Sequence, residues 1–345
     1  MKKESIVDIA KLFFAYIVVA IHTNAFSEIM IGEVNVGILV SRLLYDFAVP
    51  FFFVCSGFFL GNKLIKVDKK CEKKIIIIKY FKRLLVPYLV WGIWYFIINC
   101  SLEIVTEEKS ILDVVKTHLK QWVMTSPGGG LWYVQSILIL LGFLYCFGIN
   151  KSFNIIWFIL LILSTISEFG YSIMNKYEYI KRIIDLYEMI FVSRLNFVFF
   201  GIFFFQGIFL VKYFNFFEKI LKKRLFFYTI ITYIMYCISI YASGIGYIFM
   251  NLFKILFISM LFLILYNTEL PLKKIDTLKI RKMSNIIYFT HFTCIYVFKV
   301  VMTLLRISFD KYATIMFILC GILLTIYSMI IIKFDKKRKI IDLIY

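Results

Sequence analysis

The sequence predicts an all-α, polytopic membrane protein with about ten transmembrane helices and with its N- and C-termini in the cytoplasm. The first observation behind this prediction is composition, because 62% of the 345 residues are hydrophobic, more than one water-soluble core can bury. The second is length, because ten spans of about 20 residues use roughly 200 residues and leave only short connections. We therefore expect residues 1–345 to form a single membrane domain.

Each expected span is an apolar run bounded by charged or turn-forming residues. The ten runs lie near residues 5–27, 37–60, 84–104, 129–148, 153–170, 189–211, 225–243, 246–266, 286–305 and 312–332. A turn at residues 243–246 separates the seventh run from the eighth. The two runs together are too long for one span, so we expect a tight helical hairpin there.

The distribution of lysine and arginine predicts the orientation of the spans, since cationic loops resist translocation. With the N-terminus inside, the cytoplasmic segments hold 27 of these side chains and the outer segments hold eight. The first run carries Asp8, Lys11 and His22 and ends without a small-x-small cleavage site, so we expect a retained span and not a signal peptide. The Lys- and Ile-rich composition favours a bacterial plasma membrane.

Charge distribution and cysteine spacing argue against a nucleic-acid partner, a metal site and a disulfide framework. The net charge of +19 lies in short loops between apolar runs and not on one folded basic face, so we expect no nucleic-acid partner. The seven cysteines lack the two-to-four-residue spacing of a zinc or redox site, so neither a metal nor a disulfide framework is indicated. Membrane lipid is the expected surrounding partner, and the oligomeric state is open.

The first helix carries three ionisable residues at membrane depth, where charged groups are costly and therefore functional candidates. At 100° per residue, the steps from Lys11 to His22 end about 20° from a whole number of turns, and Asp8 lies one turn before Lys11. The three side chains therefore share one face over a rise of about 16 Å from Lys11 to His22. An alternative is that Asp8 and Lys11 form a local ion pair at the membrane interface, while His22 is a satisfied polar residue of the bundle.

Further candidates lie on other helices. His291 follows Ser284 and Tyr288 on one helix face, and a packing role is as compatible with this pattern as a functional one. Arg42 is expected to pair with Asp46 on the same helix, or to bind substrate. Arg194 has no local partner in the sequence, which indicates an anionic ligand or a distant carboxylate such as Glu168. His118 is expected to be solvated in an outer loop.

Two loop regions also have a functional interpretation beside a structural one. Lys79, Lys82 and Arg83 precede Pro87, and this cluster is either a topological anchor or a phosphate-binding site at a helix N-terminus. Trp132 follows the glycine run at residues 128–130, which is either a flexible entrance to a helix or the mouth for an outer substrate.

Five stretches stand out in order along the chain: Lys11 to His22, Val49-Pro50-Phe51-Phe52-Phe53 leading to Ser56-Gly57, Lys82-Arg83 to Pro87-Tyr88, Gly130-Leu131-Trp132-Tyr133, and Ser284 through Tyr288 to His291. Together they resemble the acyltransferase-3 family of bacterial membrane O-acyltransferases. Relatives usually carry arginine in place of Lys11 and in place of Tyr80, and many also do so at Asp46. The resemblance implies a ten-helix fold in which His22 matches the essential histidine of the first helix.

The resemblance implies an O-acetyltransferase that moves an acetyl group from cytosolic acetyl-coenzyme A to a hydroxyl of a cell-envelope glycan or glycolipid. His22 is then the catalytic base, and Asp8 orients it or compensates its charge. Lys11, Lys79, Lys82 and Arg83 are assigned to the coenzyme, and no metal is expected. The assigned substrate-binding residues are Arg42, Trp132, Arg194 and His291. The alternative is a transporter of a lipid-linked glycan or a small polar solute such as an amino acid, which would use the same polar face.

Overall fold

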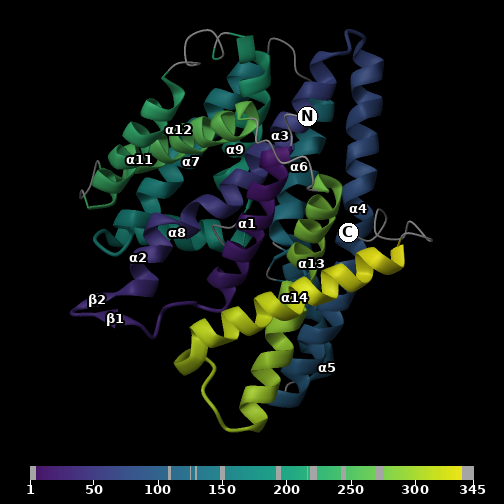
Figure 1. Ribbon diagram of the computed structural model, residues 1–345, viewed down its shortest axis with the longest axis vertical. Helices are drawn as coiled ribbons and strands as arrows, with labels where there is room; N and C mark the ends of the chain where they lie inside the picture. Colours follow the sequence, from purple (N-terminus) through teal and green to yellow (C-terminus); the bar gives the residue numbers. More distant parts are fainter. Residues whose placement is uncertain are drawn as a thin grey trace. The chain divides into compact units, whose positions relative to one another are not determined.

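The computed structural model describes residues 5–107, 110–124, 126–128, 130–147, 152–191, 196–215, 217, 224–241, 246–268 and 276–335. These residues are helical almost throughout, as predicted (Figure 1). The helices are α1 (Ser5–His22), α2 (Val36–Leu43), α3 (Ala48–Ile65), α4 (Lys70–Glu107), α5 (Ile111–Met124), α6 (Trp132–Phe147), α7 (Ser152–Ile173), α8 (Glu178–Phe191), α9 (Phe197–Lys212), α11 (Leu225–Tyr241), α12 (Gly246–Asn267), α13 (Thr277–Leu304) and α14 (Ala313–Asp335). Short 3-10 helices η1 (Tyr45–Phe47) and η2 (Asp310–Tyr312) precede α3 and α14.

Helix length and apolarity confirm the membrane character of the fold. The stretches long and apolar enough to cross a membrane are Val36–Ile65, Lys70–Ile104, Phe153–Ile173, Gly246–Asn267, Thr277–Leu304 and Asp310–Asp335. The shorter helices α6, α9 and α11 are also apolar. Each of the ten expected runs overlaps a helix, while the count of ten spans and the cytoplasmic termini stay predictions.

The run expected at residues 37–60 is broken in the structure. α2 ends at Leu43, and Leu44 leaves the helical region with φ −134° before η1 begins. The prediction that Arg42 and Asp46 lie on one continuous helix is therefore wrong. The break allows the Tyr45 hydroxyl to donate a hydrogen bond to the Ala25 carbonyl at 3.3 Å.

The third expected span begins earlier than predicted. α4 starts at Lys70 and continues through Pro87 to Glu107 (Figure 1). Long membrane helices tolerate an internal proline, because neighbouring groups satisfy the backbone acceptor that it frees. Lys79, Lys82 and Arg83 therefore lie inside α4, and the prediction that they stand at a helix N-terminus is wrong.

Two segments expected as outer loops contain helices α5 and α8. α5 buries Val114 and His118, which lie four residues apart on one face. His118 Nε2 lies 2.8 Å from Glu103 Oε2 on α4, so the expected solvated His118 is in fact buried and paired. The connection between α1 and α2 also holds a small antiparallel hairpin of β1 (Met30–Ile31) and β2 (Val34–Asn35).

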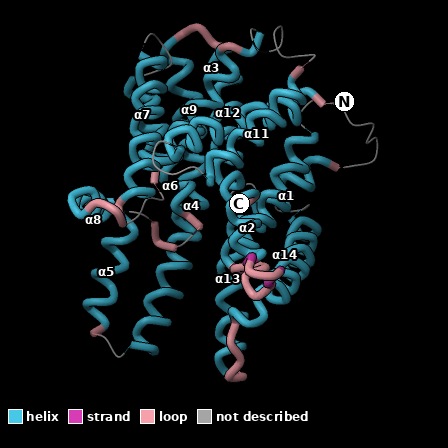
Figure 2. Tube along the Cα trace, turned by 90° about the vertical axis from the view of Figure 1, so that its left-hand side faces the viewer, coloured by secondary structure: helices cyan, strands magenta, loops and turns pink. Residues whose placement is uncertain are grey.

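The chain divides into two compact units, Met1–Phe51 with Ile264–Tyr345, and Phe52–Leu263. In the first unit α1, α13 and α14 pack against one another, and Figure 2 shows α13 beside α14. α1 and α13 run parallel, because Asp8 pairs with Arg281 at one end and His22 contacts His291 at the other.

In the second unit, α9 forms the core. It packs against α6 and α7, and apolar residues occupy all of its faces, as expected for a helix surrounded by protein. Its most deeply buried side chains are Phe203, Phe204, Phe205, Ile202 and Ile208.

Glycines allow α3 and α9 to touch at the backbone. A Cβ atom on Gly57 would lie 1.9 Å from the Phe204 carbonyl oxygen, and one on Gly207 would lie 2.2 Å from the Val54 carbonyl oxygen. Small residues at such crossings are how membrane helices approach closely and gain packing contacts. Gly57 therefore has a structural function in this fold.

Replacing Gly57 or Gly207 by alanine should destabilise the protein, since the new methyl group meets backbone and not a movable side chain. We expect the free energy of unfolding to fall by about 1–3 kcal/mol or more, measured as a lower melting temperature in detergent. Gly142→Ala on α6 is the matched control, because a Cβ there meets nothing within 4 Å. Equal melting temperatures for all three variants would contradict the close crossing.

Candidate active site

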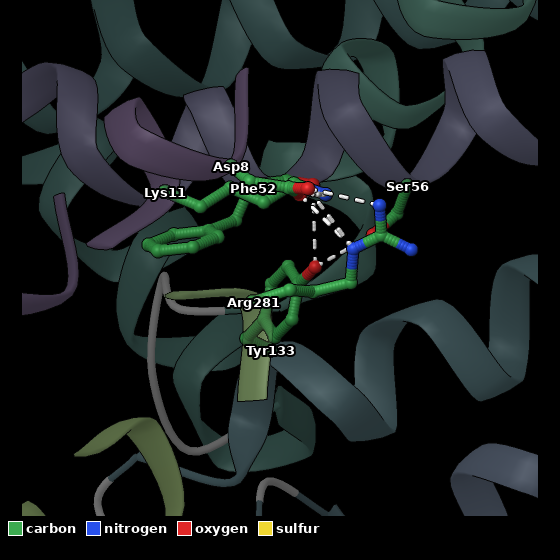
Figure 3. Close-up of polar contacts among 6 residues, drawn as sticks. All are labelled: Asp8, Lys11, Phe52, Ser56, Tyr133 and Arg281. Atoms are coloured by element: carbon green, nitrogen blue, oxygen red, sulfur yellow. Dashed lines mark hydrogen bonds and ion pairs between the residues drawn. The ribbon is translucent and has the colours of Figure 1, made fainter. Parts of the chain in front are cut away.

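Asp8 near the start of α1 is paired with an arginine on another helix. Its side chain is 1% exposed, and Arg281 of α13 donates to it from Nε at 3.1 and 3.2 Å and from Nη2 at 2.9 Å (Figure 3). The planar guanidinium thus holds both carboxylate oxygens, a strong and directional arrangement. Lys11 Nζ lies 3.9 Å from Asp8 Oδ1, too far for a direct hydrogen bond.

Arg281 was not singled out from the sequence. It lies among the lysines and arginines before the ninth apolar run, where it counted only as a topological signal. The sequence does indicate that Asp8 needs a partner, because a carboxylate at membrane depth is costly in free energy unless a cation from another segment compensates it. A sequence without a contact map cannot say which of the many cations supplies it.

His22 ends α1 and lies against α13. The ring centroids of His22 and His291 are 5.4 Å apart, and the Phe292 ring lies 4.3 Å from His22 and 4.6 Å from His291. The structure thus brings together two of the predicted site residues from opposite ends of the chain. Asp8 lies 14 residues before His22, about 21 Å along the helix, so its pair with Arg281 is at the other end of the same polar face.

His291 has a fixed tautomer and an unused nitrogen. Its Nδ1 lies 2.6 Å from the Tyr288 carbonyl oxygen, and because a carbonyl only accepts, Nδ1 carries the proton. The neutral ring then presents a lone pair on Nε2. That atom is buried and has no hydrogen-bond partner among the residues that the structure describes. A buried polar atom of this kind is costly unless a ligand or water satisfies it.

The loop after His22 is tied to α14. The Phe26 amide donates to Thr314 Oγ1 at 2.8 Å, and the Thr314 amide donates to Glu28 Oε1 at 2.8 Å. Burial raises the pKa of Glu28, but hydrogen bonds from its own backbone and from Thr314 outweigh burial and hold the pKa below its usual 4.5. In the same loop Asn24 and Phe26 adopt left-handed conformations, with φ of 54° and 70°. The two bonds to Thr314 tie the segment that follows His22 to α14.

The remaining predicted site residues lie elsewhere. Lys79, Lys82 and Arg83 are exposed on α4. Trp132 is buried at the start of α6, with ring centroids 4.9 Å from Phe200 and 6.1 Å from Phe53. Arg42 lies near the end of α2 in the first unit. Arg194 lies outside the described residues.

Two of the stretches that carry the family resemblance meet within the second unit. Ser56 Oγ lies 2.8 Å from the Tyr133 hydroxyl, which also donates to the Phe52 carbonyl at 3.2 Å (Figure 3). A hydroxyl network of this kind satisfies polar atoms between α3 and α6. Together with the Gly57 crossing, it gives these motif residues a role in holding the bundle together.

Comparison with protein families finds a match to an acyltransferase domain over residues 4–334. This match covers both compact units and almost the whole chain. No curated protein and no solved structure matches the chain.

Arg281→Gln should destabilise the first unit, because it leaves the buried Asp8 carboxylate without its two-point partner. We expect the free energy of unfolding to fall by about 3 kcal/mol, measured by thermal melting in detergent. The double variant Asp8→Asn with Arg281→Gln should recover most of this loss, since it removes the uncompensated charge. Lys11→Gln should cost less than about 1 kcal/mol. A double variant as unstable as the single one would contradict the pairing.

Proposed function

The chain belongs to the acyltransferase-3 family of membrane acyltransferases, and we propose that it is an O-acetyltransferase of the bacterial plasma membrane. Its donor is cytosolic acetyl-coenzyme A, and its acceptor is a hydroxyl of a cell-envelope glycan or glycolipid. The observation that carries the proposal is the contact between His22 and His291, two histidines that α1 and α13 bring to ring centroids 5.4 Å apart.

Two adjacent imidazoles suit acyl transfer to a hydroxyl. A sugar hydroxyl is a weak nucleophile, and a histidine can remove its proton as it attacks. In the proposed step His22 takes the proton while the hydroxyl oxygen bonds to the thioester carbonyl carbon. The carbon–sulfur bond then breaks, and the proton held by His22 passes to the leaving coenzyme A sulfur. The products are the acetyl ester and free coenzyme A.

His291 has the features of a substrate-binding residue in this scheme. Its protonated Nδ1 is fixed by Tyr288, so only Nε2 can meet a ligand, and it can do so only as an acceptor while the ring is neutral. The acceptor hydroxyl supplies the donor that Nε2 lacks. A hydrogen bond of this kind aligns the hydroxyl before His22 takes its proton.

The cations are proposed to bind the coenzyme. Lys11 lies on the same helix as His22, and Lys79, Lys82 and Arg83 are exposed, so each can pair with phosphate. Asp8 compensates charge at the Lys11 end of the helix, where Arg281 holds it. We propose that the acceptor is contacted by Arg42, Trp132 and Arg194.

Replacing His22 by alanine should abolish labelling of envelope glycan or glycolipid from radiolabelled acetyl-coenzyme A in native membranes. General-base removal lowers rates by about 10²–10⁴-fold. His118→Gln is the matched control, because it removes a buried histidine that is paired with Glu103 instead, and it should keep transfer where the protein is present in equal amount. Undiminished labelling in the His22 variant would overturn the assignment, and labelling absent from the wild type would overturn the proposed activity.

Replacing His291 by phenylalanine should weaken acceptor use more than donor use, because it keeps the ring packing against Phe292 but removes Nε2. We expect the acceptor concentration for half-maximal transfer to rise about tenfold, with little change for acetyl-coenzyme A. The measurement is the initial rate of labelling at a series of concentrations of an extract of native envelope lipid and glycan. An equal effect on both substrates would instead indicate a role in the chemical step or in the fold.

A further inference from the structure

A second polar cluster lies inside the second unit, between α7 and α12. Glu168 and Lys254 form an ion pair with side chains that are each 8% exposed, and Asn251 is 1% exposed one turn before Lys254. Both helices belong to stretches long and apolar enough to cross a membrane. Ionisable residues in such a place are functional candidates by default.

The Glu168 carboxylate is only partly satisfied by the residues that the structure describes. Its Oε1 lies 3.8 Å from Lys254 Nζ, beyond hydrogen-bond distance. Its Oε2 is buried with no hydrogen-bond partner among the described residues. A water or another small polar group can bridge a polar contact longer than 3.5 Å.

Asn251 adds a second unsatisfied atom. Its Nδ2 donates to the hydroxyl oxygens of Ser164 at 3.1 Å and Thr165 at 3.2 Å. Its Oδ1 is buried and unpartnered within the described part of the chain. The cluster therefore holds two acceptor atoms, both more than nine-tenths buried, that require donors from outside it.

A neighbouring network, in which Gln206 of α9 joins α7 to α12, satisfies its buried polar groups. Trp157 of α7 donates to Gln206 Oε1 at 2.8 Å, and Gln206 Nε2 donates to Ser259 Oγ of α12 at 2.9 Å. Ser259 in turn donates to the Ile255 carbonyl at 2.7 Å. This network is closed, in the sense that its side chains satisfy one another. The Glu168 cluster is open, because two of its acceptor atoms have no partner among the described residues.

We propose that Glu168 and Asn251 form a binding site for a neutral hydroxyl group. Both open atoms are acceptors, so the ligand must donate hydrogen bonds. The charges of Glu168 and Lys254 already cancel, so a cation would be repelled by the Lys254 ammonium and an anion by the carboxylate. A hydroxyl both donates and accepts, so it also fits when the Asn251 amide is turned over.

The hydroxyl has two possible sources, ordered water or the sugar hydroxyls of the acceptor. The second source rests on the proposed function, since a glycan or glycolipid acceptor carries several hydroxyls besides the one that reacts. Contacts to such remote groups contribute binding energy and orientation.

The test uses variants that remove the polar site without leaving an unpaired charge. Glu168→Met with Lys254→Met replaces the ion pair by apolar side chains of similar length, a change that is often neutral for stability. Asn251→Leu removes the amide. Gln206→Leu on α9 is the matched control, because it disrupts the neighbouring network that joins α7 and α12 through Gln206. All are compared as full-length protein in phosphatidylcholine nanodiscs.

Two measurements distinguish the sources. If sugar hydroxyls bind, the concentration of envelope extract needed for half-maximal transfer rises about tenfold or more in the Met double variant and in Asn251→Leu. The acetyl-coenzyme A concentration for half-maximal transfer stays unchanged in these variants. In the Gln206→Leu control both concentrations stay unchanged. If water binds, transfer kinetics stay unchanged, but the infrared carboxylate band of Glu168 shifts between H₂O and D₂O and is missing from the Met variant.

The proposal is overturned if acceptor use is unchanged in both variants and the carboxylate band is insensitive to D₂O. The infrared measurement requires no transfer activity. A wild type without His22-dependent labelling but with the D₂O shift would therefore refute the proposed function and leave the hydroxyl site standing.

Discussion

The fold depends on pairing charges that lie on apolar helices. Asp8 is held by Arg281, Asp335 by Lys282 at 3.3 Å, and Glu168 by Lys254. In each pair the partner comes from another helix, so folding must bring the helices together before either charge is compensated. Breaking such a pair is costly, while the same pairing gives the bundle one preferred register. The Asp8 pair thereby sets which face of α1 meets α13.

That register places the histidines. Asp8 and Arg281 fix one end of the parallel pair. From there the helices rise about 21 Å to His22 and about 15 Å to His291, and the two rings meet with centroids 5.4 Å apart. The loop after His22 is then fixed through Thr314 to α14. The candidate active site is thus held from both ends of α1, as a reaction that needs aligned groups requires.

Within the described part of the chain, some buried polar atoms are satisfied by hydrogen bonds within the protein, and others are not. The Trp157, Gln206 and Ser259 network is closed, and so is the pair of His118 with Glu103. Among the residues that the structure describes, no hydrogen-bond partner reaches His291 Nε2, Glu168 Oε2 or Asn251 Oδ1. Because an unsatisfied buried atom costs more than a hydrogen bond gains, these open positions are where ligands are expected, and both proposals start from them.

The sequence by itself determined the helical membrane class, the approximate place of each long apolar helix and the family, because apolar runs and local motifs are properties of neighbouring residues. It also marked Asp8, Lys11 and His22 as one face of a helix. Tertiary structure alone decided that Arg281 pairs with Asp8, that α4 runs through Pro87, and that His118 is buried on α5. The Arg281 pair and the burial of His118 depend on residues brought from another helix, whose contacts no local periodicity encodes.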